Sequence, residues 1–324
     1  MEAVQATPDP AGTGSLMGPS VDGRIPVADG VGVAGMRGLV RRINQHTGSG
    51  LVHLGDADSG ETSGAAYVRW PDGRRSVVTH ATVSATRMRQ TAHVLEMARD
   101  RGLPVPRHKL TVELDHGVVA VAQEQLPGTR AAHIDAAVID ALVAVNDRFA
   151  GLLAQRPDVP VPPLNLPRAG TSDPRYELVN RYSDRSRRLL RRIQEIGAAS
   201  PAEMTGTDLV HPDFTAPNVL FDDAGQVTGV IDWNNGAARG DRHHALVKLL
   251  FDLTWDAASP TGGHQHVQAG ATDRLETHLH QTVAPHLLRL YWAHWTLTML
   301  NWTIPAGDPA VVDLHLDLGE RGLN

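Results

Sequence analysis

The chain contains no cysteine, which excludes disulfide bonds and metal sites built on thiolates. It also lacks an N-terminal basic segment followed by an apolar core, so we expect no secretory signal and a cytoplasmic protein. Lysine is scarce as well, because Lys109 and Lys248 are the only lysines among 324 residues. A ligand site that depends on a lysine therefore has few candidates in this chain.

Nothing in the sequence favours a membrane or a nucleic acid as the partner. The longest apolar stretch, residues 283–304, contains Pro285, Arg289 and Asn301, which are poorly suited to burial in a bilayer, so we expect a core helix. The net charge of −6 argues against general nucleic-acid binding and is compatible with a cationic ligand. We therefore expect a small molecule as the partner.

Polar side chains gather around a predicted hairpin in the second half of the chain. A short apolar strand ending at Val210 leads into a loop that carries His211, Asp213 and Asn218. A second apolar strand, a turn and a return strand follow, and Asp232 comes directly after them. A hairpin of this length returns the chain to its starting point. Asp213, Asn218 and Asp232 should therefore converge on one small site.

These three side chains form a set that suits phosphoryl transfer. Carboxylate and amide oxygens are the ligands that magnesium prefers, and the ion completes its shell with water and nucleotide phosphates. Asn218 and Asp232 are our candidate magnesium ligands, while Asp213 is placed to orient and deprotonate an attacking hydroxyl. An ordinary polar turn is the alternative for His211 and Asp213.

The pattern His-x-Asp-x-x-x-x-Asn, followed by a strand and Asp232-Trp233, resembles the aminoglycoside phosphotransferase and choline kinase-like family, and antibiotic phosphotransferases of actinobacteria in particular. Residues 240–253 also resemble the helix that follows the metal-binding aspartate in that family. The resemblance implies an α+β protein kinase-like fold with two lobes. It also implies Mg²⁺ and ATP or GTP, the phosphoryl donor, bound between the lobes.

The sequence can be divided along the chain in agreement with such a fold. We expect a disordered leader over residues 1–22, an N-terminal lobe over 23–122 with a small antiparallel sheet, an interlobe linker over 123–128, and a mostly helical C-terminal lobe over 129–324. The expected helices are 31–44, 83–101, 131–155 and 183–198, and the expected N-terminal strands are 51–54, 65–70, 76–79, 111–113 and 118–122.

Two segments are candidates for nucleotide binding. The connection between the first two strands offers backbone N–H groups to phosphate oxygens, although its composition fits a plain flexible hairpin equally well. Its candidate residues are Ser59, Gly60, Ser63 and Gly64. In the resembled family the backbone of the linker contacts the nucleobase, which here implicates Gln123 and Gln125. Such contacts do not separate ATP from GTP.

The usual phosphate-binding lysine is missing. A kinase-like fold places it on the third strand, paired with a glutamate on the next helix. Here the strand offers His80 as the nearest basic candidate, and Gln90 lies near the position expected for the glutamate. Either His80, loop amides and magnesium hold the phosphates together, which we favour, or the protein binds nucleotide poorly.

The resemblance also suggests how the substrate is held and what it is. The family uses an acidic pocket in the helical lobe to recognise amino groups, so Asp252 and Asp256 are candidate substrate contacts, with exposed helix carboxylates as the alternative. We expect a small-molecule kinase that phosphorylates a hydroxyl of an antibiotic of aminoglycoside, cyclic peptide or nucleoside type and so confers resistance. The alternatives are a metabolic kinase for choline, homoserine or a sugar, and a catalytically silent kinase-like binding protein.

Overall fold

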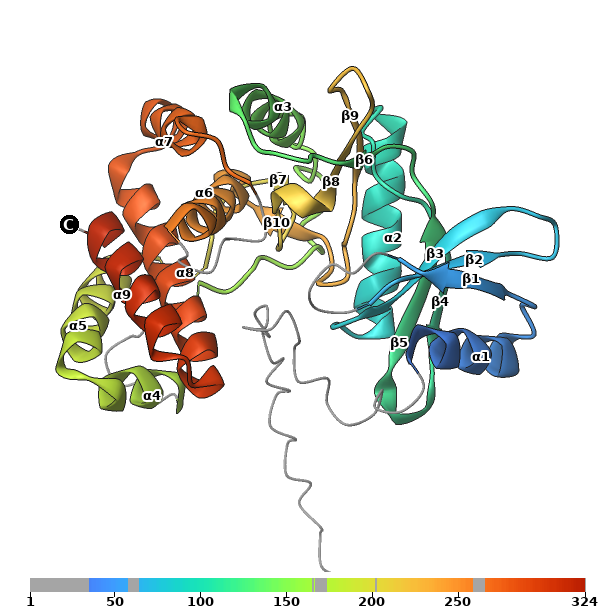
Figure 1. Ribbon diagram of the computed structural model, residues 1–324, viewed down its shortest axis with the longest axis horizontal. Coiled ribbons are helices and arrows are strands. Elements are labelled where there is room, and N and C mark those ends of the chain that lie inside the picture. Colours follow the sequence, from blue (N-terminus) through green and yellow to red (C-terminus); the bar gives the residue numbers. More distant parts are fainter. Residues whose placement is uncertain are drawn as a thin grey trace, which may run out of the picture.

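The computed structural model describes residues 35–57, 64–164, 166, 174–201, 203–258 and 266–323. The predicted leader and three of the predicted phosphate-loop residues, Ser59, Gly60 and Ser63, lie outside this part of the chain. The described residues form two lobes, with an antiparallel sheet in one and most of the helices in the other (Figure 1). This confirms the predicted α+β class.

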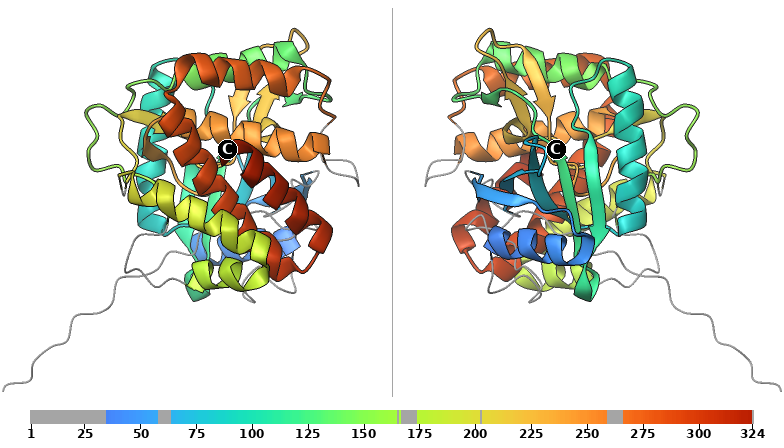
Figure 2. Two further views of the ribbon diagram at one scale, coloured as in Figure 1. Left: turned by 90° about the vertical axis from the view of Figure 1, so that its left-hand side faces the viewer. Right: turned by 90° about the vertical axis from the view of Figure 1, so that its right-hand side faces the viewer.

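A five-stranded antiparallel sheet forms the N-terminal lobe, in the order β1-β2-β3-β5-β4. Its strands are β1 (Val52–Asp56), β2 (Ala66–Arg69), β3 (Arg75–Ala81), β4 (His108–Glu113) and β5 (Val119–Glu124). Helices α1 (Gly35–Thr47) and α2 (Ala85–Asp100) lie on opposite faces of this sheet (Figures 1 and 2). Side chains alternate along a strand, so Val78 packs with α1 while Val119 and Val121 pack with Met88 of α2.

Short strands connect the two lobes. They are β6 (Thr129–Arg130), β7 (Asp208–Val210), β8 (Val219–Phe221), β9 (Val227–Val230) and β10 (Ala238–Gly240). Strands β8 and β9 form the predicted hairpin, β6 pairs along the other edge of β8, and β7 pairs with β10. The hairpin holds the candidate site between the lobes (Figure 1).

The first helix of the C-terminal lobe is shorter than predicted. The expected helix over residues 131–155 is reduced to α3 (Ala136–Asp147). Before it, the backbone N–H of Ile134 donates to His266 in an extended segment, and Asp135 caps the helix. After it, the carbonyl of Phe149 accepts the N–H of Leu209. These tertiary hydrogen bonds override the local helical pattern at both ends.

Six further helices complete the described part of this lobe, with α6 and α8 in its core. They are α4 (Pro174–Tyr182), α5 (Asp184–Ala198), α6 (His243–Ala258), α7 (Ala271–Thr282), α8 (Pro285–Ala306) and α9 (Pro309–Leu323). Helix α8 contains the apolar stretch that we expected in the core, and its buried Trp292 packs against Phe251 of α6. Among the described helices, none combines the length and apolar character needed to cross a bilayer.

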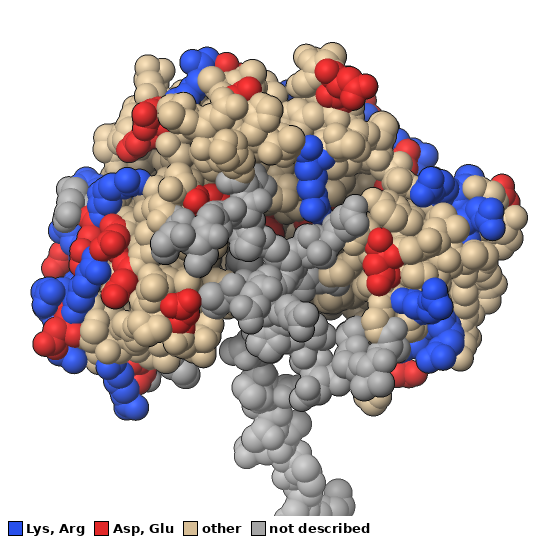
Figure 3. Space-filling view, in the orientation of Figure 1, with Lys and Arg blue, Asp and Glu red and all other residues tan. Residues whose placement is uncertain are grey.

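The arginine-rich helix α5 packs against α9 through ion pairs. Ser183 caps α5, and the Arg185 guanidinium contacts Asp313, Asp317 and Glu320 of α9. Basic and acidic side chains are accordingly mixed over this end of the molecule in the space-filling view (Figure 3). The arginine face of α5 thus serves helix packing as well as contact with solvent.

Buried histidines should make the protein sensitive to acid. Burial lowers the pKa of His108 to about 4 and that of His315 to about 3, and it also lowers the pKa of His211 and His244. In the unfolded chain a histidine titrates near about 6.5, so below that pH the unfolded state binds more protons and stability falls. Each group contributes up to roughly 1.4 kcal/mol per pH unit. Urea unfolding should show the free energy of unfolding dropping as the pH falls from about 7 to about 5.

A matched pair of variants tests this cause. The His315 ring stacks on Phe251 and Trp255, with centroid distances of 5.7 and 6.0 Å, so His315→Phe preserves the packing and should reduce the pH slope. The exposed His93, changed to Gln, is the control and should keep the wild-type slope. Asp232 changes the free energy of unfolding in the opposite direction as the pH falls. Burial and a neighbouring carboxylate raise its pKa to about 6, so the folded protein takes up this proton more readily than the unfolded chain. Equal slopes for wild type and His315→Phe would contradict the explanation.

Candidate active site

His211 braces the loop that carries Asp213. Its ring is buried at the end of β7, and its Nδ1 accepts the backbone N–H of Asp213 at 3.1 Å. Nε2 therefore carries the proton and donates it to the carbonyl of Ile231 at 2.9 Å. Burial lowers the pKa of His211, which agrees with this neutral form, and the Trp233 ring lies 4.3 Å from it between centroids. His211 thus ties the backbone of Asp213 to the carbonyl of Ile231 after β9.

The hairpin brings Asn218 beside the residues that precede Asp232. The Asn218 carbonyl accepts the N–H of Ile231 at 2.8 Å, directly before Asp232 in the chain. The Asn218 side chain donates through Nδ2 to the carbonyl of Asp213 at 3.0 Å. Its amide oxygen is then the atom that suits a cation. The structure therefore brings Asp213, Asn218 and Asp232 together, as the sequence predicts.

Asp232 is partly buried and has an unusual backbone conformation. Its φ of +64° lies in the left-handed region, which aspartate tolerates better than most residues. Asn234 Nδ2 donates to Asp232 Oδ1 at 2.6 Å, and Asn234 Oδ1 accepts the hydroxyl of Thr79 at 2.8 Å, which links the site to β3. Burial raises the pKa of Asp232 to about 6, and the negative charge of Asp213 adds to the rise. A bound cation would offset this electrostatic cost.

The donor atoms of this cluster fit magnesium. The carboxylate of Asp232 and the amide oxygen of Asn218 are hard oxygen ligands, which Mg²⁺ accepts. Within the described ranges there is no group of three or more histidine, aspartate or glutamate side chains able to hold a metal by themselves. Such a sparse protein shell suits an ion that completes its coordination with water and phosphate.

Thr79, and not His80, faces the carboxylates from the N-terminal lobe. Because side chains alternate along β3, His80 lies on the face shared with Val78, which packs toward α1. The structure does not bring His80 to Asp232, which contradicts the prediction that His80 replaces the lysine. The sequence prediction named a residue one position away from Thr79. Because side chains alternate between the two faces of a strand, a shift of one position places the side chain on the opposite face.

Threonine hydroxyls on β3 and α2 form hydrogen bonds with the segment that follows Asp232. The Thr79 hydroxyl bonds Asn234, and the hydroxyl of Thr91 on α2 accepts the N–H of Ala237 at 2.9 Å. Gln90 points elsewhere, because its Nε2 donates to the carbonyl of Asp158 at 2.8 Å. These contacts join α2 and β3 to the segment after Asp232, and the Arg87 guanidinium of α2 adds a charged contact to the carbonyl of Ala237.

Arg130 is a basic residue near the site that sequence reasoning missed. It lies exposed on β6, where it pairs with Leu220 of β8. Its positive charge opposes the rise in the pKa of Asp232. The sequence could have indicated Arg130, because this arginine comes two residues after the predicted linker and pairs with the strand that follows Asn218.

The sheet continues into the predicted linker. Strand β5 runs through Glu124, and Gln123 is buried and paired with Val77 on one side and His108 on the other. Backbone groups able to meet a nucleobase therefore begin at Gln125, whose contact with nucleotide stays a prediction. Gly64, the one predicted loop residue within the described chain, has a φ of +60° that favours glycine.

The predicted substrate carboxylates lie on α6. Asp252 forms an ion pair with Lys248 on the same helix, and Lys248 Nζ also lies 3.6 Å from Asp213 Oδ1. Asp256 is one turn further along and is partly buried. Asp252 thus already has a cationic partner from the protein, and its contact with a substrate stays a prediction.

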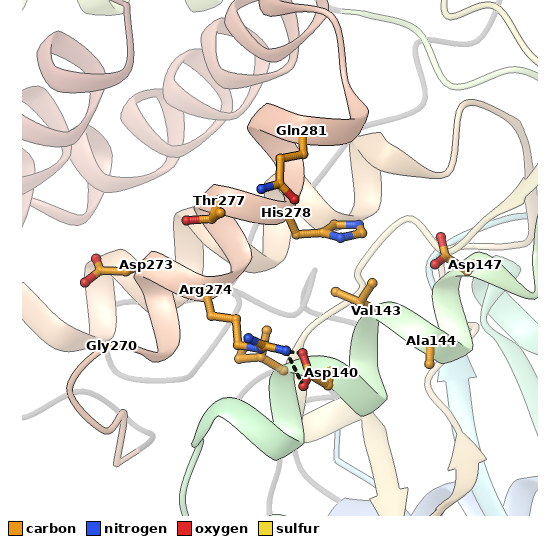
Figure 4. Close-up of a pocket in the computed structure, with 11 residues that line it drawn as sticks. Asp140, Val143, Ala144, Asp147, Gly270, Asp273, Arg274, Thr277, His278 and Gln281 are labelled. Atoms are coloured by element: carbon orange, nitrogen blue, oxygen red, sulfur yellow. Dashed lines mark hydrogen bonds and ion pairs between the residues drawn. The ribbon is translucent and has the colours of Figure 1, made fainter.

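A cavity of about 600 Å³ lies elsewhere in the helical lobe, between α3 and α7. Figure 4 shows Arg274 of α7 reaching Asp140 of α3, with Asp147 and His278 also on its walls. None of the predicted site residues lines it. This cavity is therefore separate from the candidate active site, which we identify from its side chains and their hydrogen bonds.

The fold and the braced Asp213, Asn218 and Asp232 cluster between two lobes define a kinase-like phosphotransferase. The chain belongs to the phosphotransferase enzyme family, whose model matches residues 56–286, more than half of the chain. It is accordingly an enzyme of the small-molecule kinase class. A comparison with curated protein sequences gives no significant match.

Solved structures of antibiotic kinases share the fold. Aminoglycoside phosphotransferase APH(4)-Ia has a TM-score of 0.59 at 16% identity, over 89% of this chain and 98% of that chain. A thermostable mutant of it, solved with ADP and hygromycin B, has a TM-score of 0.58 at 17% identity, over 87% and 97%. Amicoumacin kinase hAmiN, in complex with AMP-PNP, Ca²⁺ and Ami, has a TM-score of 0.57 at 13% identity, over 84% and 88%. At these identities the likeness establishes the fold alone.

Proposed function

We propose that the protein transfers the terminal phosphoryl group of ATP or GTP to a hydroxyl of a small-molecule antibiotic, of aminoglycoside, cyclic peptide or nucleoside type. The observation that carries the proposal is the convergence of Asp213, Asn218 and Asp232 on a loop braced by His211. The antibiotic class is supported by neighbours solved with hygromycin B and with amicoumacin. The product is an inactivated drug, formed in the cytoplasm.

The chain supplies positioning and charge to this reaction. Asp213 orients the acceptor hydroxyl and takes its proton late, since a loose transition state asks little of a strong base. Asn218 and Asp232 would hold magnesium, which offsets charge on the phosphate oxygens when it is bound. His211 keeps the Asp213 backbone fixed through its own hydrogen bonds. The acceptor oxygen forms the new bond to phosphorus, the bond from phosphorus to the β–γ bridging oxygen breaks, ADP or GDP leaves, and the proton ends on a carboxylate oxygen of Asp213.

Arg130 should contribute to nucleotide affinity in place of the missing lysine. It lies on β6, immediately after the linker and beside β8, and its charge reaches Asp232. A charge-assisted contact with phosphate is worth about 1.5–3 kcal/mol, so Arg130→Ala should weaken nucleotide binding about tenfold or more. His80→Ala is the control and should leave affinity within about twofold. Calorimetric titration with ATP and GTP in the presence of Mg²⁺ makes the comparison, and the reverse ranking would restore His80 to this role.

A panel of acceptors tests the substrate class. The protein is incubated with Mg²⁺ and either ATP or GTP against hydroxylated antibiotics of the three types and against choline, homoserine and sugars. Mass spectrometry then detects the addition of one phosphoryl group. A phosphorylated antibiotic supports the resistance function, and phosphate on metabolites alone would replace it with the metabolic alternative. No transfer to any acceptor would favour the catalytically silent kinase-like protein.

A further inference from the structure

Lys248 is a buried cation that contacts the candidate catalytic loop from another element. Its side chain is 3% exposed, and its Nζ lies 3.6 Å from Asp213 Oδ1 while also pairing with Asp252. Asp213 and Asp252 are partly open to solvent, with side chains 33% and 23% exposed. One of only two lysines in the chain is therefore enclosed behind the carboxylate that should meet the substrate.

The position of Lys248 is fixed by the start of its helix. Asp241 caps α6, because its Oδ1 accepts the N–H of His243 at 3.0 Å. Its Oδ2 accepts the hydroxyl of Tyr291 on α8 at 2.8 Å, which ties the beginning of α6 to the core. The Lys248 ammonium also lies 5.4 Å from the centroid of the Trp295 ring of α8. The ammonium is therefore presented to Asp213 from a rigid support.

Two interpretations of this lysine make different predictions. In the first interpretation, Lys248 only stabilises the fold. Asp252, one turn along the same helix, is then a sufficient partner for Lys248, and the contact with Asp213 has no role in the reaction. A buried ammonium is costly, however, and burial lowers the pKa of Lys248 while Asp252 and Asp213 together raise it above its ordinary value. Both carboxylates thus hold the charged form, and the contact with Asp213 joins α6 to a loop 35 positions earlier.

We propose that Lys248 is a positioning residue for Asp213, which holds one carboxylate oxygen of that side chain and leaves the other for the acceptor hydroxyl. This inference rests on the proposed phosphoryl transfer. The ammonium also offsets the repulsion that Asp213 exerts on Asp232 and on an approaching phosphate. An aspartate without this partner would be free to turn away from the acceptor.

The test is a comparison of three variants with the wild-type protein. Lys248→Met keeps the length of the side chain and removes the charge, and it should lower kcat by about 10- to 100-fold with little change in KM for acceptor or nucleotide. Lys109→Met, at the only other lysine, which is exposed, is the matched control and should keep the wild-type kcat. The double variant Lys248→Met/Asp252→Asn also removes the negative charge of Asp252, the ion-pair partner of this lysine on α6.

The double variant separates the two interpretations. Its melting temperature should return toward the wild-type value because no charged carboxylate on α6 is left facing a missing cation, while kcat should stay low. Recovery of kcat together with stability would overturn the proposal and leave a structural ion pair, as would a normal kcat in Lys248→Met. If Lys248→Met alone fails to fold, the double variant carries the comparison. A wild-type protein that transfers phosphate to no acceptor would overturn the proposed function and this inference with it.

Discussion

Replacing Asp213 with alanine should lower kcat by about 10²- to 10⁴-fold while the protein stays folded. The side chain is one-third exposed and its neighbours remain tied, because His211 bonds the backbone of residue 213 and not its carboxylate. Lys248 keeps Asp252 as a partner, so no buried charge is left alone. Steady-state kinetics with the acceptor found in the panel, together with circular dichroism, measure the two effects.

The control for this variant lies at the far end of the same hairpin. Asp223 is exposed in the turn between β8 and β9, so Asp223→Ala removes an equal charge from the same supersecondary unit without touching the loop. It should keep the wild-type kcat. Near-normal turnover in Asp213→Ala would show that another group orients the acceptor hydroxyl.

Replacing Asp232 with asparagine should abolish the effect of magnesium on nucleotide binding. Wild-type protein should bind ATP or GTP more tightly when Mg²⁺ is present, because Asp232 would hold the ion and the ion would offset the charge of the phosphates. The variant keeps the shape of the side chain and loses its charge, so titrations with and without Mg²⁺ should give similar affinities. Turnover should fall by orders of magnitude, since the charge on the transferred group is no longer offset.

The same variant should be more stable than the wild-type protein. Burial and Asp213 raise the pKa of Asp232 to about 6, so near neutral pH its charge costs folding free energy. Removing that charge should raise the free energy of unfolding by roughly 1–3 kcal/mol in urea titrations near pH 7. Loss of magnesium dependence without a gain in stability would mean that Asp232 is not strained electrostatically. A stable variant that keeps its magnesium response would remove Asp232 from the metal site.

The hairpin and its site could be predicted because the information is local. Strand, turn and return strand lie within residues 208–232, and their lengths determine that Ile231 meets Asn218. The N-terminal strands were also recognised, because turn residues such as 71–74 and 115–117 separate short apolar runs in the sequence. The long helix over 131–155 was predicted wrongly, because the hydrogen bonds that end it come from residues 209 and 266, far away in the chain.

The residues around the site were harder to predict for physical reasons. Choosing between Thr79 and His80 requires the face of β3, which depends on where α1 and α2 pack. Lys248 and Asp252 form a pair at a spacing visible in the sequence, but the contact with Asp213 depends on how α6 crosses the catalytic loop. Long-range packing of this kind leaves no periodic signal in a single sequence.

Transfer of a phosphoryl group at the Asp213 site is the central claim, and phosphorus NMR tests it directly. Wild-type protein and Asp213→Ala are followed side by side with Mg²⁺, the preferred nucleotide and the best acceptor. We expect the γ-phosphate signal to decline with the growth of a phosphate monoester on the acceptor in the wild-type sample alone. Ester formation at the same rate in both samples would contradict the role of Asp213. Nucleotide binding without any ester in the wild-type sample would contradict the proposed reaction itself.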